Sequence, residues 1–242
     1  LIEQADKALG ESLSAVMFEG PGEELTRTCN CQPALYVHGL ACLAVLKELV
    51  PSLNPVAAAG LSLGEFTAHA AAGTYSFEEG LRLVQKRGAF MEEACNATKG
   101  TMAAMIGGTD ENVIKLAQEC DVDVANFNCP GQTVVSGTEE GVAKAVAGAK
   151  AAGCKIAKKL NVAGAYHSRL MHSAMVKLAE ELKNISFGTP SMPVYCNYEA
   201  RVVEGPDDIR SMLEHQVCGS VRWTASMQKL VDQGHRLFIE LG

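Results

Sequence analysis

Residues 59–65, AGLSLGE, decide how this chain folds and what it can do. They follow a short apolar run, PVAAA (55–59), and precede a mostly apolar segment, FTAHAAAGTY (66–75). A short apolar run that ends at a glycine is typical of a central parallel strand, and the segment after it has helical character. The pattern G-x-S-x-G at such a junction permits a tight turn that exposes the serine. Ser62 is therefore either part of an ordinary strand-to-helix turn or a nucleophile held on a sharp elbow.

The composition is that of a globular protein with a sizeable core. The chain has 242 residues, of which 48% are hydrophobic and 20% charged, enough for one large domain or two unequal ones. The formal net charge of −7 and the lack of a basic stripe argue against a general nucleic-acid binder. No uninterrupted apolar stretch has the roughly 18 residues that a membrane span needs. The longest candidate, 33–46, contains His38 and runs into Lys47, so it predicts a buried helix.

The ends of the sequence indicate how much of the natural protein it contains, and the cysteines indicate its compartment. We find no signal peptide. Because the sequence starts at Leu1 and stops at Gly242, we expect one or both ends of the natural protein to lie outside it. The nine cysteines are scattered and form no paired C-x-x-C framework. This pattern favours reduced thiols in a cytosol-like compartment over disulfides or a zinc site.

Residues 1–98 and 167–242 read as alternating helices and strands of one larger parallel-sheet domain. The segment 34–50 has helical length and is apolar nearly all round, so it should lie inside. A capping box, Ser76 to Glu79, opens a helix over 76–95. After residue 167 the pattern predicts a helix, a strand, a helix and a strand, at 169–185, 193–198, 222–234 and 236–241.

Residues 99–166 have a different pattern. They predict the order βαββαβ over about seventy residues, which is the ferredoxin-like arrangement. The expected elements are strands at 100–108 and 154–166, helices at 110–120 and 139–153, and two strands within 122–137. The chain is thus expected to hold a small α/β unit, 99–166, inserted into a discontinuous large domain, 1–98 and 167–242.

A nucleophilic serine needs a base, and His167 is the best candidate. In NVAGAYHSRLM (161–171) it stands where a strand ends and a helix begins, the kind of junction where α/β active sites collect. His38 and His69 lie in apolar helical runs, where a buried structural histidine is expected. The remaining histidines look like helix, surface or turn residues: His172, His215 and His235.

Four segments together carry a resemblance to a known family. They are 60–91 around Ser62, GAYHSRLM (164–171), NCQPAL (30–35) and NCPGQTVVSG (128–137). They resemble malonyl-CoA:acyl carrier protein transacylases, the malonyl-loading enzymes of fatty acid synthesis, in the family's order and spacing over essentially the whole chain. The resemblance implies an α/β fold with an α/β-hydrolase-like parallel-sheet core and a ferredoxin-like insert.

The resemblance also implies catalytic roles. Ser62 matches the nucleophile that becomes an acyl ester, and His167 matches the base that takes its proton. The N–H of Leu63 would face the reacting carbonyl as one oxyanion donor. In this family a backbone carbonyl, not a carboxylate, orients the histidine, and the matching residue is Gln216.

Three further residues match the substrate-binding positions of the family. Arg87, 25 residues after Ser62, matches the arginine that grips malonate's free carboxylate. A buried guanidinium rejects acetyl because that ligand leaves the charge unpaired, and lysine lacks the planar fork. Met91, one helical turn later, would line the same pocket, and Asn128 matches a position at the cleft rim.

The implied activity is a ping-pong transfer through a malonyl-serine ester. The substrates would be malonyl-CoA and the phosphopantetheine thiol of acyl carrier protein, with no bound cofactor, metal, nucleic acid or membrane. A monomer in the cytoplasm, or alternatively in the plastid stroma, is expected. The family's first strand and the glycine- and glutamine-rich loop that supplies a second oxyanion N–H would precede Leu1.

Other functions remain open from the sequence. A serine acyl hydrolase of related fold predicts an acidic partner for His167 and has no use for Arg87. A non-catalytic carrier-binding module predicts no covalent chemistry at Ser62. A discrete acyltransferase of a polyketide pathway predicts the same site with a different carrier.

Overall fold

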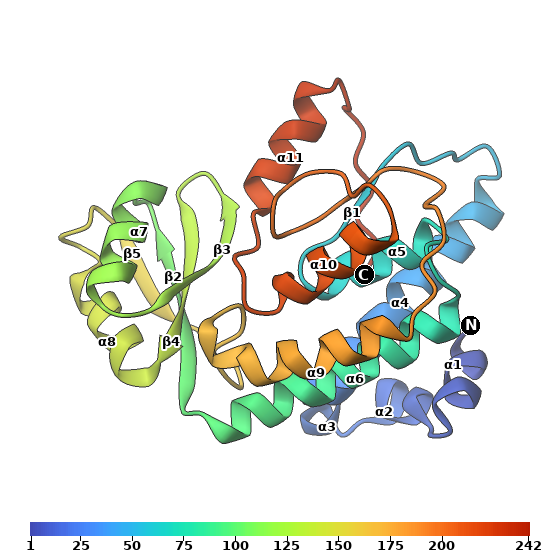
Figure 1. The fold of residues 1–242 in the computed structure, drawn as a ribbon, viewed down its shortest axis with the longest axis horizontal. Coiled ribbons are helices and arrows are strands. Elements are labelled where there is room, and N and C mark those ends of the chain that lie inside the picture. The colour runs from blue at the N-terminus through green and yellow to red at the C-terminus, as the bar shows by residue number, and fades with distance from the viewer.

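The computed structural model describes all 242 residues (Figure 1). Separate hydrophobic cores lie in two parts of the chain. The larger core joins 29 buried residues from the segments before residue 96 and after residue 170. A second core of 11 residues lies entirely within 103–154. In Figure 1 the small unit stands on the left, and the long helices α6 (Phe77–Ala97) and α9 (His172–Lys183) run side by side in the lower part of the large unit.

The remaining elements have the following bounds. The other helices are α1 (Ile2–Leu9), α2 (Leu13–Glu19), α3 (Gly22–Thr26), α4 (Thr28–Leu49), α5 (Leu63–Ala71), α7 (Asp110–Glu119), α8 (Glu139–Gly148), the 3₁₀ turn η1 (Arg169–Met171), α10 (Pro206–Gln216) and α11 (Trp223–Asp232). The strands are β1 (Ala58–Ala59), β2 (Gly100–Ile106), β3 (Asp123–Cys129), β4 (Gln132–Thr138), β5 (Ile156–Lys159) and β6 (Val194–Tyr195).

The small unit is built around one antiparallel sheet. Its elements follow the order β2-α7-β3-β4-α8-β5, and its strands lie in the order β3-β4-β2-β5. Side-chain caps start both of its helices, because the hydroxyls of Thr109 and Thr138 accept N–H groups of the first turn. The βαββαβ order expected from the sequence is therefore present, with the two helices packed on one another.

The large unit holds a parallel pair of very short strands. Ala58 pairs with Val194 and Ala59 with Tyr195, so β1 is a parallel strand as predicted but only two residues long. The prediction of a strand at 236–241 is wrong. That segment has no strand partner and no regular structure, and Leu237 is 81% exposed. An apolar run becomes a strand only where a neighbour satisfies its backbone groups.

The helix α4 is less buried than predicted. One face of its first half, up to Leu40, packs in the core against α5 and α6, whereas the second half lies at the surface with Leu49 74% exposed. By length and mean hydropathy alone α4 would suit a membrane span, a property that buried core helices share. The expectation that His38 is buried is also wrong, because it points outward from this helix.

His69 is buried, as the sequence predicts. It lies on α5 with no exposed surface, and its Nδ1 is 3.1 Å from the hydroxyl of Thr74. Its Nε2 has no hydrogen-bond partner. Burial lowers the pKa of His69 to about 4, because the cation would lose its hydration.

Acidification should therefore destabilise the protein through His69. The unfolded chain takes up a proton below pH 6.5, whereas folded His69 stays neutral down to about pH 4. Stability from this residue is complete above pH 6.5 and is lost as pH falls toward 4, about 3 kcal/mol in all. The free energy of unfolding in urea, measured at pH 7 and at pH 4.5, should fall between these pH values by about 2 to 3 kcal/mol less in His69→Gln than in the wild type. The exposed His172→Gln serves as control, and equal losses in all three proteins would contradict the assignment.

Candidate active site

Ser62 stands on a strained turn between β1 and α5. Its φ is 53° and its ψ is −108°, a left-handed region that residues with a Cβ rarely adopt. A Cβ on Gly60 would come within 1.9 Å of the carbonyl oxygen of Gly64, so position 60 must be glycine. A Cβ on Gly64 would meet nothing within 4 Å. The tight turn therefore depends on Gly60, and strain of this kind is typical of functional sites.

His167 faces Ser62 across the site. Its Nε2 is 2.7 Å from the Ser62 Oγ, and its Nδ1 is 2.8 Å from the backbone carbonyl oxygen of Gln216. A carbonyl only accepts, so Nδ1 carries the proton and Nε2 accepts from the serine hydroxyl. His167, like Ser62, has a positive φ, 55°. The structure thus brings the three predicted residues into one hydrogen-bonded chain with a carbonyl at its end.

The environment keeps His167 neutral. The ring is 4% exposed, and burial followed by the positive charge of Arg87 lowers its pKa to about 4. At neutral pH the imidazole is therefore unprotonated at Nε2 and able to take a proton from Ser62.

Leu63 is the first residue of α5. Its N–H is one of the groups at a helix start that have no partner within the helix, and the dipole of α5 adds positive potential there. The N–H of Ser62 itself is occupied, because it donates to Asn197 Oδ1 at 2.6 Å. Leu63 thus has a backbone N–H without a helical partner directly beside Ser62, as an oxyanion donor requires.

Arg87 reaches the nucleophile from α6. It is 1% exposed, and its Nη2 donates to Ser62 Oγ at 3.0 Å and to the side-chain Oε1 of Gln216 at 2.9 Å. Its Nη1 donates to Gln32 Oε1. The guanidinium also lies over the ring of Phe66, 5.1 Å from the centroid.

The charge of Arg87 has no direct counterion. No carboxylate lies within ion-pair distance of it, and its buried Nε has no hydrogen-bond partner. Burial lowers its pKa to about 10, so the guanidinium is still a cation at neutral pH. A buried, unpaired cation beside a serine hydroxyl is a strong attractor for an anionic group.

Met91 and Asn128 occupy different surroundings. Met91 is buried one turn after Arg87 on α6, and its sulfur accepts from Gln32 Nε2 at 3.4 Å. Asn128 is near the end of β3, where its Nδ2 donates to Gln132 Oε1 at 3.2 Å. Its buried Oδ1 has no partner, and it makes no hydrogen bond to Ser62, His167 or Arg87.

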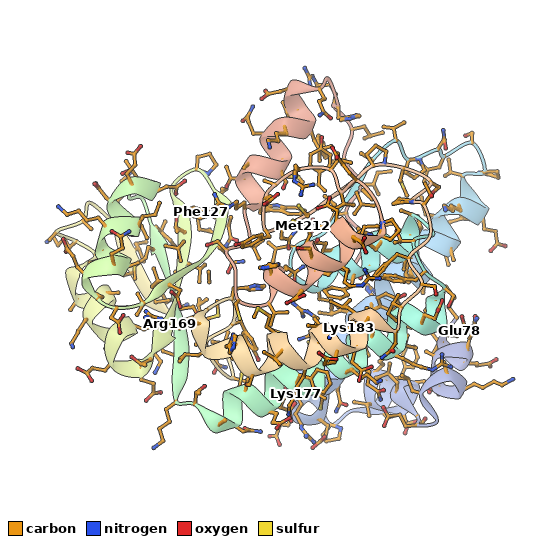
Figure 2. The ribbon with its side chains drawn as sticks, viewed as in Figure 1. Glu78, Phe127, Arg169, Lys177, Lys183 and Met212 are labelled. Carbon is orange, nitrogen blue, oxygen red and sulfur yellow. The ribbon has the colours of Figure 1, made fainter.

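The edge of β3 is joined to the large unit just beyond Gln216. The N–H of Phe127 donates to the Val221 carbonyl at 2.9 Å, and Thr224 Oγ1 donates to the Phe127 carbonyl at 3.0 Å. Figure 2 shows Phe127 between the small sheet and the helices of the large unit. This junction fixes the strand that carries Asn128 to the segment after α10.

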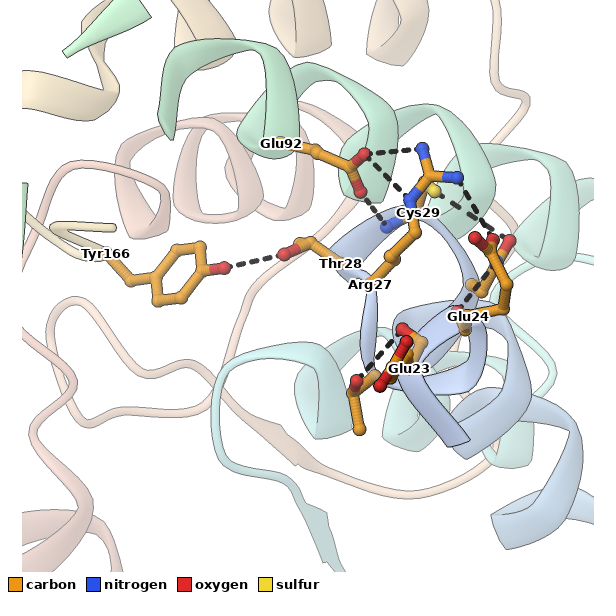
Figure 3. Close-up of polar contacts among 9 residues, drawn as sticks. Glu23, Glu24, Arg27, Thr28, Cys29, Glu92 and Tyr166 are labelled. Atoms are coloured by element: carbon orange, nitrogen blue, oxygen red, sulfur yellow. Dashed lines mark hydrogen bonds and ion pairs between the residues drawn. The ribbon is translucent and has the colours of Figure 1, made fainter. Parts of the chain in front are cut away.

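Polar contacts hold the neighbouring chain segments around His167. The hydroxyl of Tyr166 lies 2.6 Å from that of Thr28, at the start of α4 (Figure 3). Next to it, Glu92 of α6 accepts from the N–H of Cys29 and from the guanidinium of Arg27 (Figure 3). These contacts tie the start of α4 to α6 and to the segment before His167.

Three buried residues of the site are absent from the sequence-based candidates. Gln32 lies in the NCQPAL segment and holds Arg87. Asn197 accepts from the N–H of Ser62, and Glu65 in turn accepts from the N–H of Asn197. The only signal in the sequence was Glu65 itself, an acidic residue directly after the elbow in an otherwise apolar run.

The side chains are not arranged to bind a metal ion or to form a disulfide. No group of three or more His, Cys, Asp or Glu side chains is placed to hold a metal ion. All nine cysteines are free thiols.

Comparison with known proteins assigns the chain to a well-populated group. The acyl transferase domain profile matches residues 1–242. The malonyl CoA-acyl carrier protein transacylase of Bacillus subtilis (strain 168) is 41% identical over 247 residues, covering 100% of this chain and 77% of that protein. The malonyl CoA-acyl carrier protein transacylase structure from Coxiella burnetii has a TM-score of 0.93 and 35% identity over 96% of this chain and 75% of that one. A malonyl-transacylase solved in complex with its type II PKS acyl-carrier protein has a TM-score of 0.92 and 37% identity, over 96% and 76%.

Proposed function

The chain belongs to the acyl transferase domain family, and from this membership we propose that it transfers malonyl from malonyl-CoA to the phosphopantetheine thiol of acyl carrier protein. The reaction is an S-malonyltransferase step of fatty acid biosynthesis. The observation that best supports malonyl as the substrate is the position of Arg87. This buried cation has no carboxylate partner and lies 3.0 Å from Ser62 Oγ.

The first half-reaction forms an ester. His167 Nε2 takes the proton of Ser62 as Oγ bonds to the thioester carbonyl carbon, and the Leu63 N–H stabilises the oxyanion. The carbon–sulfur bond then breaks, and the imidazolium returns the proton to the leaving CoA thiolate. Throughout, Gln216 holds the Nδ1–H through its backbone carbonyl.

The second half-reaction reverses these steps with another thiol. His167 takes the proton of the phosphopantetheine thiol, whose sulfur attacks the malonyl ester, and Ser62 leaves with the proton. Both half-reactions exchange an acyl group between oxygen and sulfur, so their atoms balance without a redox cofactor or metal.

Arg87 is proposed to hold the free malonyl carboxylate. In the structure it contacts Ser62, Gln32 and Gln216, so the carboxylate would take over some of these hydrogen bonds. Met91 would line the same pocket from α6. Asn128, with its unpartnered Oδ1 near the end of β3, would hold the acyl thioester at the rim.

We also propose the domain organisation that accompanies this activity. It consists of an α/β-hydrolase-like acyltransferase domain over 1–98 and 167–242 with a ferredoxin-like subdomain over 99–166. The separate cores and the strand order β3-β4-β2-β5 support this division. Acyl carrier protein as partner is supported by the relative solved with its carrier. We also propose that the protein acts as a monomer, and a cytoplasmic location is consistent with its bacterial relatives.

The hydrolase alternative has less support. It requires an acidic partner for His167, whereas the group at Nδ1 is the carbonyl of Gln216. It also gives no role to the buried charge of Arg87.

Mass spectrometry after incubation with malonyl-CoA or acetyl-CoA tests the proposal. We expect malonyl-CoA alone to add a stable malonyl group at Ser62, which acyl carrier protein then removes. Rapid loss of the label to water would favour the hydrolase, and no label under any condition would favour a non-catalytic carrier-binding module. Carriers from fatty acid and polyketide systems, offered separately, identify the pathway.

A further inference from the structure

We propose that Glu65 is a positioning residue that holds the nucleophile elbow, the histidine-orienting segment and Arg87 in one hydrogen-bonded network. The inference rests on the acyl transfer proposed above, and it concerns Ser62 reactivity in general more than malonyl recognition. Glu65 lies on α5, three residues after Ser62, and has no exposed surface.

Side chains hold both peptide groups of the strained serine. The Ser62 N–H donates to Asn197 Oδ1 at 2.6 Å, and the Ser62 carbonyl accepts from Gln216 Nε2 at 3.0 Å. Asn197 Nδ2 also donates to the Gly60 carbonyl at 2.8 Å. The unfavourable φ of Ser62 is therefore maintained by two amides from outside the elbow.

One carboxylate oxygen of Glu65 anchors both of these residues. Oε2 accepts from the backbone N–H of Asn197 at 2.9 Å and from Gln216 Nε2 at 2.7 Å. Asn197 follows β6 and Gln216 ends α10, so Glu65 connects three separate segments. Hydrogen bonds to an ionised carboxylate are about twice as strong as those between neutral groups.

The amide of Gln216 links two buried charges. Its Oε1 accepts from Arg87 and its Nε2 donates to Glu65, so this orientation of the amide is the one both charges favour. The backbone carbonyl of the same residue holds His167 Nδ1. Loss of the negative charge on Glu65 would weaken the anchor of Arg87 and of the histidine together.

The surroundings of Glu65 bring its pKa close to neutral pH. The titratable groups around it are Arg87 from α6, Tyr75 after α5 and Cys196 after β6, and Tyr36 is the buried titratable group of α4. Burial raises the pKa of Glu65 to about 7, against the opposing effects of its hydrogen bonds and of Arg87. Its Oε1 accepts no hydrogen bond, so nothing at that oxygen favours the ionised form.

The test is the pH dependence of Ser62 reactivity in the full chain. Two probes are used: malonyl-CoA and a fluorophosphonate that labels activated serines without needing Arg87. In the wild type we expect labelling by both to fall roughly tenfold as pH drops from 8.5 to 5.5, with an inflection near 7. Glu65→Gln imitates the protonated acid, so it should label at the slow rate at every pH, with no inflection.

Stability separates positioning from a structural defect. The ionised carboxylate is costly to bury, so Glu65→Gln should be slower at pH 8.5 but no less stable to urea. The control is Leu178→Ala, a core variant on α9, which should lose stability and keep the inflection.

Three outcomes would overturn the inference. They are a wild type without an inflection near 7, an inflection that persists in Glu65→Gln, and unchanged labelling rates in that variant. Because the wild-type profile needs no variant, the test stands even if Glu65→Gln fails to fold. If malonyl-CoA does not label the wild type but the fluorophosphonate does, the proposed function fails while the fluorophosphonate profile still decides the role of Glu65.

Discussion

A Ser62→Ala variant is expected to take no malonyl group from malonyl-CoA and to lose transfer to acyl carrier protein by roughly 10⁵-fold or more. The reason is that the ester intermediate needs the Oγ that lies 2.7 Å from His167 Nε2. Mass spectrometry of the intact protein and a thiol-release assay would measure the two effects. Because the serine and the histidine act as a unit, Ser62→Ala combined with His167→Ala should be little worse than Ser62→Ala alone.

The matched control is Ser226→Ala on α11. Its side chain is buried, at 1% exposed, and its hydroxyl has no hydrogen-bond partner. Its removal should leave both activities within about twofold of the wild type, because the hydroxyl makes no hydrogen bond to any group of the site. Malonyl label on the Ser62→Ala protein at the wild-type rate would show that another residue is the nucleophile.

Replacement of Arg87 by alanine should reverse the acyl preference. Malonyl loading should fall about 10³-fold, because the malonyl carboxylate would be buried without a partner. Acetyl loading should rise, because no unpaired buried cation is left when acetyl binds. The measurement is kcat/KM of CoA release with each thioester, and the malonyl-to-acetyl ratio is the decisive quantity.

Two further variants make this test specific. Arg82→Ala removes an exposed arginine of the same helix and should keep the wild-type ratio. Arg87→Lys keeps the charge but not the planar fork, so it should recover only part of the malonyl preference. An unchanged ratio in Arg87→Ala would refute the role proposed for Arg87, even if that variant were slower with both substrates.

Local chemistry explains why much of the secondary structure was predictable. The capping box at Ser76 and Glu79 forms as expected at the start of α6, because both groups lie within one helical turn. The βαββαβ order of the small unit followed from apolar periodicity and turn residues. The predictions that failed depended on tertiary neighbours, which local sequence does not reveal. The segment 236–241 has strand composition but no neighbouring strand, and the apolar second half of α4 is not covered.

The candidate nucleophile and base could be named from the chain alone, through the tight turn around Ser62 and the junction at His167, and the family resemblance added Arg87. These depend on local geometry, such as the close approach that only Gly60 allows. The arrangement of the charges depends on the packing of distant segments. Gln32, Asn197 and Gln216 reach the site from distant segments. Burial keeps His167 neutral and raises the pKa of Glu65 to about 7, whereas Arg87 stays charged despite its burial. Desolvation and hydrogen bonding are properties of the packed site, and no spacing along the chain encodes them directly.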